Sequence, residues 1–346
     1  MKQGLTLNQL QTQIQLQENI KHDYVALASD IQFSPDLVEI TGDGDKYKPT
    51  GLFHEQMAGF CDIPRRYYDR MRQDAPALLT ENVGHWLKNS RKPRLVRTLG
   101  GDARAFLSSK YLRLDHGQVM SQLFPRLMDR NDLHVESADV TPTRMHLKVV
   151  SPKIEGEVRK GDVVRAGLAI SNSEVGLGAL EVQFLLYRLV CTNGLIRAGN
   201  AGHGVRRYHV GKKLQIGEAP PADGLTAEGV WTRALGAANY LLDAERFRAV
   251  IDSLRGAAGM RITGDPETAV EILAKRVYLN KEESGQVLNT LLAENDLTQW
   301  GLVNAVTRTA QAVTDYDRST ELEALGGSIL DLDSSQWREI AEAQPN

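Results

Sequence analysis

Past the middle of the chain the apolar pattern changes from alternation to helical spacing, and this change limits the possible folds most. Between Leu133 and Val182, two stretches alternate apolar and polar residues on both sides of a turn, at Thr141-Pro142 and at Gly176 to Gly178. This alternation is typical of β-hairpins. Beyond Thr226, apolar residues recur at spacings of three and four, which indicates helices. The sequence therefore predicts an α+β fold, with central antiparallel β-hairpins and packed helices followed by an all-helical C-terminal region.

Shorter patterns predict the remaining elements. A helix is expected from Thr6, a suitable N-cap, to Ile20. Next come a helix over 54–60, a tight turn and a second helix that starts at Pro64. A pair of strands is expected around Gly100-Gly101, and 24–51 is typical of irregular structure with short strands. Further helices are expected at 116–128, 226–254, 265–278, 281–293, 298–313 and 320–325.

The length of 346 residues exceeds the size at which one hydrophobic core usually stops growing. We expect an N-terminal helix and irregular segment (1–46), an α+β core with a basic face (47–220), and a helical, acidic C-terminal region (221–346). The boundary near Pro221 ends a segment punctuated by Gly and Pro, which is typical of a linker or a functional loop.

The stretch from Ile170 to Ile196 passes from polar turn residues through an apolar segment to Cys-Thr-Asn-Gly. Asn193-Gly194 tolerates the left-handed backbone that ends helices and closes tight turns. We expect a short helix capped by this pair, and the alternative is one long strand that turns there. Cys191 is expected to be a small buried residue, because no base stands at a spacing diagnostic of a thiolate nucleophile.

Motifs for several kinds of chemistry are missing. The spacing of a Walker phosphate loop does not occur, so ATP hydrolysis is not indicated. Cys61 and Cys191 are too far apart in sequence to indicate a disulfide framework or a zinc pattern, and scattered carboxylates such as Glu174 and Glu181 form no paired Mg²⁺ motif. Four histidines show no metal-ligand spacing: His134, His146, His203 and His209. We expect no cofactor, no metal site and no catalytic residue.

The net charge of −3 conceals a strong asymmetry. Residues 65–113 contain 12 Lys and Arg against 4 Asp and Glu, a local charge of +8, whereas residues 282–346 contain 3 Arg against 12 Asp and Glu, a local charge of −9. Such asymmetry indicates an anion-binding face together with an acidic region, although solvated helix faces have the same composition. No apolar run is long enough to span a bilayer, so we expect a cytoplasmic protein without a membrane segment.

The basic residues predict contacts to the phosphates of a nucleic acid. Trp86 and Tyr111 are candidate stacking platforms, which favour single strands, whereas strand alternation places Phe106 in the core. A second basic group lies between Arg197 and Lys213, where no acidic residue occurs. The predicted phosphate-binding residues are Arg65, Arg66, Lys88, Arg91, Lys92, Arg94, Arg97, Arg104, Lys110, Arg113, Arg206, Arg207, Lys212 and Lys213. An alternative use of the two helices around Pro64 is helix-turn-helix reading of a DNA groove.

"YRLVCTNGLI", together with "SNSEVG" before it and "WGLVNAVTRTAQAV" near the C-terminus, resembles the phage/plasmid-like proteins of domain-of-unknown-function family 932. The resemblance covers roughly Tyr47 to Asp331. It implies a mobile genetic element in a bacterial cytoplasm and supplies no established activity. A helix followed by paired hairpins is also similar to the core of single-strand annealing recombinases, an analogy at the level of the fold. Annealing proteins act as rings or filaments, so a homo-oligomer is expected.

Three hypotheses follow for the function. The leading one is a mobile-element protein that binds nucleic acid, with single-stranded DNA favoured, and supports recombination or replication without hydrolysing nucleotides. The first alternative is an interaction protein that binds a host protein and counters a host defence through its acidic helical region. The second alternative is an enzyme that uses Cys191 or a carboxylate cluster.

Overall fold

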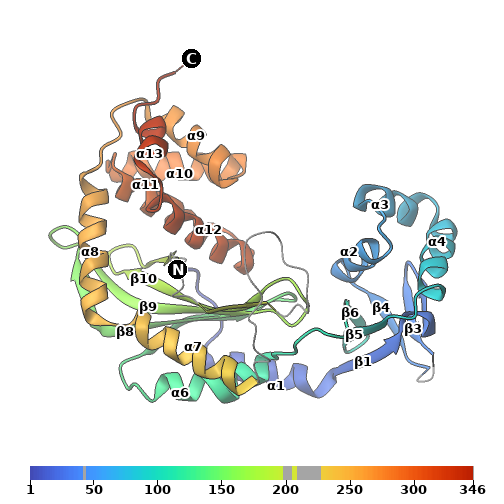
Figure 1. The fold of residues 1–346 in the computed structure, drawn as a ribbon. Coiled ribbons are helices and arrows are strands. Elements are labelled where there is room, and N and C mark those ends of the chain that lie inside the picture. The colour runs from blue at the N-terminus through green and yellow to red at the C-terminus, as the bar shows by residue number, and fades with distance from the viewer. Residues whose placement is uncertain (42–43, 198–204, 209–226, 346) are drawn as a thin grey trace.

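The computed structural model describes residues 1–41, 44–197, 205–208 and 227–345. Two lobes are visible, and α1 and β1 lead from one to the other (Figure 1). The N-terminal lobe comprises β1–β6 and α2–α4. The main lobe comprises α1, β7–β12 and the remaining helices. Because α1 belongs to the main lobe, the chain leaves this lobe at Ile20, forms the N-terminal lobe, and returns before α5.

The N-terminal lobe is a sheet with the strand order β1-β5-β6-β4-β3-β2. Its strands are β1 (Lys21–Leu27), β2 (Ile31–Ser34), β3 (Leu37–Ile40), β4 (Lys46–Pro49), β5 (Pro93–Leu99) and β6 (Asp102–Ser108). Helices α2 (Gly51–Phe60) and α4 (Pro76–Lys88) pack on the sheet. Helix α3 (Arg65–Asp74) packs on these two helices. This lobe has its own hydrophobic core, which includes Phe53, Leu79 and Phe106. The expected limit at residue 46 falls inside this sheet.

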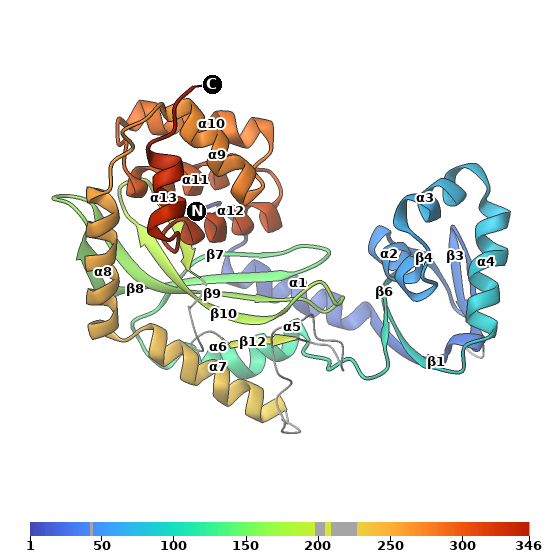
Figure 2. The same cartoon turned by 45° about the horizontal axis from the view of Figure 1, so that its top comes forward.

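The main lobe is built on the predicted hairpins. Its sheet has the order β11-β10-β9-β8-β7, and β12 pairs with the other end of β10. The strands are β7 (His134–Val140), β8 (Met145–Glu157), β9 (Val163–Asn172), β10 (Ala179–Arg188), β11 (Asn193–Arg197) and β12 (Val205–Tyr208). Both faces of this sheet are covered by helices, as the turned view also shows (Figure 2).

One face of the main sheet is covered by α1 (Leu7–Ile20), α7 (Ala227–Leu241) and α8 (Ala244–Gly259), together with the helical segment α5 (His116–Gln118), η2 (Val119–Leu123) and α6 (Phe124–Met128). The other face carries α11 (Gln299–Ala312) and α12 (Tyr316–Ile329) against β11. Helix α10 (Lys281–Glu294) packs against α11, and α9 (Pro266–Val277) packs against α10 and α13 (Ser334–Ala341). The α+β fold with a helical C-terminal region is confirmed.

Local signals located most elements. Thr6 caps α1 as expected, because its hydroxyl accepts a hydrogen bond from the N–H of Gln9. The expected helix over 226–254 is two helices, because Asp243 interrupts it and caps α8 with its side chain. Helix α12 is longer than predicted, and α13 was not predicted at all. No helix among the described residues is long and apolar enough to cross a membrane.

The preferred prediction for Cys-Thr-Asn-Gly was wrong. No short helix forms there, because β10 turns directly into β11, which starts at Asn193. The residue in the left-handed conformation is Thr192, with φ of 53°, and not Asn193 or Gly194. Asn193 and Gly194 instead pair with Arg188 and Tyr187 as ordinary strand residues.

Candidate nucleic-acid interface and interlobe ion cluster

The predicted phosphate-binding residues differ in their exposure. The exposed group lies on helices and connections of the N-terminal lobe: Arg65, Arg66, Lys88, Arg91, Lys92, Lys110 and Arg113. Arg97 and Arg104 are buried, with 1% and 8% of their surface exposed. Arg97 is too deeply buried to reach a phosphate, which corrects the expectation for this residue, whereas the small exposed part of Arg104 lines a cleft between the lobes.

The end of α4 and the connection that follows it carry three exposed basic residues. Lys88, Arg91 and Lys92 are exposed, and none of them forms an ion pair with another described residue. Trp86 lies beside them in sequence with 48% of its surface exposed, and its indole Nε1 donates to Asn82 Oδ1 at 3.0 Å. We call Trp86, Lys88, Arg91 and Lys92 the α4 patch. An exposed indole next to unpaired cations is an arrangement found on single-strand-binding surfaces.

Arg94 and Tyr111 lie in more buried surroundings than the α4 patch. The guanidinium of Arg94 lies 4.3 Å from the ring centroid of Phe60 and 5.3 Å from that of Phe106, and burial lowers its pKa. Tyr111 is 7% exposed, and its hydroxyl donates to the carbonyl oxygen of Ser173 at 3.0 Å. Tyr111 is therefore not an accessible stacking platform, and Phe106 is in the core as expected.

Helix α3 carries the exposed Arg65 and Arg66. Arg65 donates from Nε to Asp69 Oδ2 at 2.7 Å, one turn along the helix, whereas Arg66 has no ion pair among the described residues. Arg113 lies 3.4 Å from Asp23 Oδ2. Arg206 and Arg207 lie on β12, where their backbones pair with Glu181 and Leu180. Lys212, Lys213, His203 and His209 lie outside the described residues.

Arg97 is the centre of an ion cluster between the lobes. Its Nε donates to Asp23 Oδ1 at 2.8 Å, its Nη2 to Asp115 Oδ1 at 2.7 Å, and its Nη1 to the carbonyl oxygen of Glu174 at 2.9 Å. Arg104 Nη1 reaches Glu174 Oε2 at 3.3 Å. The cluster thus joins β1, β5 and β6 of the N-terminal lobe to two connections of the main lobe.

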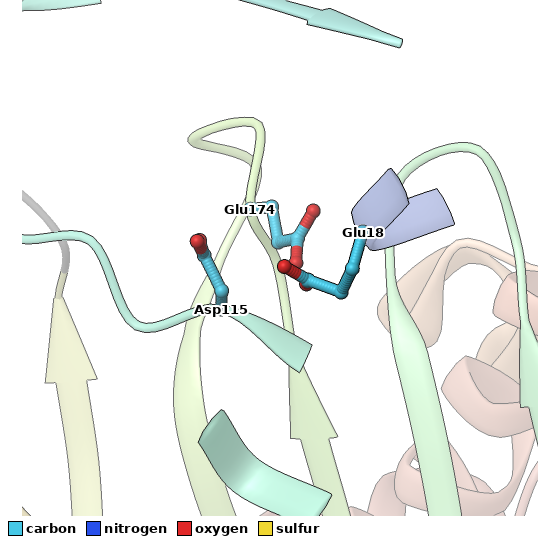
Figure 3. A group of neighbouring side chains, drawn as sticks. All are labelled: Glu18, Asp115 and Glu174. Carbon is cyan, nitrogen blue, oxygen red and sulfur yellow. The ribbon is translucent and has the colours of Figure 1, made fainter. Parts of the chain in front are cut away.

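Three carboxylates in this cluster come together from distant segments, as Figure 3 shows. One oxygen from each of Glu18, Asp115 and Glu174 lies within 4.8 Å of the others, a grouping that can hold a metal ion. The ammonium Nζ of Lys21 lies among them, at 2.6, 3.1 and 3.3 Å from these carboxylates respectively. The lysine thus provides the positive charge that a bound cation would supply.

The charges of the cluster balance. Four carboxylates (Glu18, Asp23, Asp115 and Glu174) contact four cations (Lys21, Arg97, Arg104 and Arg113). Buried charges are tolerated when they are paired and hydrogen-bonded in this way. The arrangement therefore fits a structural junction better than a metal centre.

The pKa values agree with this interpretation. Burial alone would raise the pKa of Glu174, but His116, Lys21 and Arg104, together with the N–H of His116 that donates at 2.8 Å, lower it to about 2. Burial lowers the pKa of His116 to about 4, although Glu174 opposes this shift. At neutral pH, Glu174 is ionised and His116 is uncharged.

Sequence reasoning missed the role of the Ser-Asn-Ser-Glu-Val-Gly segment (171–176), which was read as a hairpin turn. Asn172 Nδ2 donates to the carbonyl oxygen of Leu114 at 2.7 Å. On the other side, Gln56 Nε2 of the N-terminal lobe donates to the carbonyl oxygen of Val175 at 2.7 Å. With Glu174 between them, this turn connects both lobes. The signal available in the sequence was a single carboxylate, Glu174, within a short motif of mostly small and polar residues.

The other two motifs behind the family resemblance contact each other. Asn193 Nδ2 of Cys-Thr-Asn-Gly donates to the carbonyl oxygen of Asn304 at 3.4 Å and to Thr307 Oγ1 at 3.3 Å. Asn304 and Thr307 are the ends of Asn-Ala-Val-Thr on α11. Gln311 Nε2 donates to Cys191 O at 2.9 Å and to Asn193 Oδ1 at 2.8 Å. These motifs fasten the β10–β11 turn to α11.

Cys191 is half-buried rather than fully buried as expected. Burial raises the pKa of its thiol, and Arg188, whose Nη1 lies 3.3 Å from Sγ, lowers it too little to compensate. A thiol with a raised pKa is a poor nucleophile. Cys61 is buried, and burial raises its pKa to about 12.

The sequence was compared with known proteins. The sequence model of a family described as "Domain of unknown function (DUF932)" matches residues 105–325, well over half of the chain. This range starts later than the resemblance predicted at Tyr47, so it omits almost the entire N-terminal lobe and α1. Neither the curated proteins nor the solved structures contain a match.

Proposed function

We propose that this chain, which belongs to the DUF932 family, binds single-stranded nucleic acid through the α4 patch. The observation that carries the proposal is the exposed Trp86 beside three exposed cations without ion pairs among the described residues. No Asp or Glu occurs between residues 82 and 101, and no carboxylate among the described residues lies within ion-pair distance of these cations.

The shape of this patch favours a single strand. An indole face stacks on an unpaired base, whereas the bases of a duplex are already stacked on one another. The hydrogen bond from Trp86 to Asn82 fixes the indole on the helix surface, which reduces the entropy lost on binding. Lys88, Arg91 and Lys92 then neutralise phosphates on the same strand. The proposed binding needs no nucleotide hydrolysis, and it suits a role in recombination or replication.

The structure bounds the expected binding strength. Three cations that each neutralise one phosphate give a slope of about −2 for log affinity against log salt, because each single-strand contact contributes about −0.7. Stacking of one base on Trp86 contributes about 1–3 kcal/mol, a factor of about 5 to 150 in affinity.

The test is fluorescence anisotropy with labelled oligothymidine and with a duplex, over a range of salt concentrations. We expect Trp86→Ala to weaken single-strand binding about fivefold or more while duplex binding changes little. The triple variant Lys88→Ala, Arg91→Ala, Lys92→Ala should flatten the salt slope to near zero.

A matched control removes the same charge from the main lobe. Lys153, Lys160 and Arg248 are exposed cations without ion pairs among the described residues, so their combined change to Ala should leave the affinity and the salt slope intact. If the control triple weakens binding as much as the α4 triple, binding is diffuse and the proposed site is wrong. Absence of salt-sensitive binding in the unchanged protein at low ionic strength would refute the function itself.

A further inference from the structure

A cleft of about 440 Å³ lies between the two lobes. Gln13 and Gln17 of α1 line it, together with residues 50–52 at the start of α2, Leu99, Asp102 and Arg104 of the N-terminal lobe, and residues 140–143 of the β7–β8 turn. Its volume is within the range of small-molecule sites, and interfaces between lobes are where such sites are common. The α4 patch contributes no residue to it.

The polar groups of this cleft have few protein partners. The carboxamides of Gln13 and Gln17 and the carboxylate of Asp102 form no side-chain hydrogen bond or ion pair with other described residues. Gln13 and Gln17 are four residues apart, so they lie on one face of α1. Elsewhere in the cleft, Thr141 and Thr143 already donate to Asp317. The unpaired groups of the cleft are therefore on α1 and β6.

Arg104 supplies the positive charge of the cleft. It is 8% exposed, and its Nη1 is held by Glu174 at 3.3 Å, which is its one side-chain hydrogen bond to a described residue. Two of its nitrogens are thus available to a ligand on the cleft side. Asp102 and Arg104 of β6 both line the cleft, and Arg104 stands at an irregularity in the pairing of β6 with β5.

These groups match the parts of a nucleotide. A guanidinium binds phosphate oxygens, a carboxylate accepts hydrogen bonds from sugar hydroxyls, and carboxamides pair with the edges of bases. We propose that the interlobe cleft binds one nucleotide unit, with its phosphate on Arg104, its sugar near Asp102 and its base near Gln13 and Gln17. The unit is a free nucleotide or an unpaired nucleotide of a strand.

The proposal is tested with the full chain by isothermal titration with the four nucleoside 5′-monophosphates and with inorganic phosphate. The variant Gln13→Ala, Gln17→Ala removes two hydrogen-bonding groups, and we expect about tenfold weaker nucleotide binding. The matched control is Gln11→Ala, Gln15→Ala, which changes the same residue type on the same helix outside the cleft. Asp102→Asn should weaken binding without changing the fold. Circular dichroism and urea midpoints compare the folding of all variants.

Oligothymidine binding by the same variants distinguishes the two sources. If monophosphates bind and the Gln13/Gln17 variant binds them about tenfold less tightly, the free nucleotide is the ligand. If monophosphates do not bind but the variant weakens oligonucleotide binding, a nucleotide of the strand is the ligand. If the unchanged protein binds neither, or if the variant and its control bind equally, the proposal is overturned. The α4 triple variant should keep its monophosphate affinity, so failure of either proposal is recognised separately.

Discussion

Changing Glu174 to Gln removes one negative charge from the centre of the ion cluster and keeps the shape of the side chain. Glu174 is 2% exposed, and it contacts Lys21, Arg104 and the N–H of His116. The amide that replaces it cannot balance the two buried cations. The cluster then carries one excess positive charge at the junction of the lobes, and buried charges without partners are strongly destabilising.

The magnitude follows from the pKa of Glu174. The pKa is lowered from 4.5 to about 2, and one pKa unit corresponds to about 1.4 kcal/mol. Because His116 is uncharged at neutral pH and its positive charge is absent there, the remaining interactions of the ionised carboxylate contribute up to about 3 kcal/mol to the free energy of unfolding. Because the folded-state pKa is depressed, this contribution is present above pH 4.5 and is lost as the pH falls toward 2.

The assay is urea unfolding at neutral pH, followed by fluorescence and circular dichroism, with small-angle X-ray scattering in the absence of urea. Glu174→Gln should lower the free energy of unfolding by up to about 3 kcal/mol and increase the radius of gyration as the lobes loosen. Glu136→Gln is the control, because Glu136 is exposed on β7, and its effect should stay within about 0.5 kcal/mol.

Two results would refute this reasoning. One is a Glu174→Gln variant as stable as the Glu136→Gln control at neutral pH. The other is a difference in stability from the unchanged protein that does not shrink between pH 4.5 and 2, since that difference arises from ionisation of the carboxylate.

Three further predictions concern buried charges and thiols. Lys148 and Glu323 form an ion pair of 2.5 Å with at most 1% of either side chain exposed. Lys148→Met should therefore lower the free energy of unfolding in urea by about 3–5 kcal/mol, and adding Glu323→Leu should restore most of this stability. Equal losses of stability in the single and double variants would contradict this prediction. Iodoacetamide at neutral pH should modify Cys191 more slowly than a free thiol, and Cys61 only after unfolding, because burial raises the pKa values of both thiols. Rapid labelling of Cys191 in the native protein would instead support the hypothesis that Cys191 is a nucleophile. The pKa of His116 falls from 6.5 to about 4 on folding. The free energy of unfolding should therefore decline by up to about 3 kcal/mol as the pH falls from 6.5 to 4. In thermal melts over this pH range, the stability of His116→Gln should decline less than that of the unchanged protein.

Local patterns predicted the elements whose structure is locally determined. Thr6 caps α1, and the two hairpins form where alternation and turn residues coincide. The prediction of a short helix at Cys-Thr-Asn-Gly failed because the strand before this segment, β10, is buried on both faces. The run Phe184 to Leu186 is therefore apolar without alternation, and such a run does not separate a strand from a helix.

The site was harder to predict because charge pairing is not local. Arg97 looked like a phosphate ligand among neighbouring basic residues. Two of its three partners, Asp23 and Glu174, stand 74 and 77 positions away. No pattern near Arg97 indicates them. By contrast, Lys88 and Trp86 lie at a helix end, where the local sequence and the structure both leave them exposed.

The chain returns to the main lobe close to the point where it leaves, and this arrangement has a consequence for the evolution of the N-terminal lobe. The ends of the N-terminal lobe meet at the main lobe, where Lys21 Nζ lies 3.1 Å from Asp115 Oδ2, and each lobe has its own core. A segment with adjacent ends and its own core can be inserted, lost or exchanged like a cassette without rebuilding its host. The family match begins at residue 105, so it includes the main lobe from α5 to α11 and leaves out most of the lobe that bears the α4 patch.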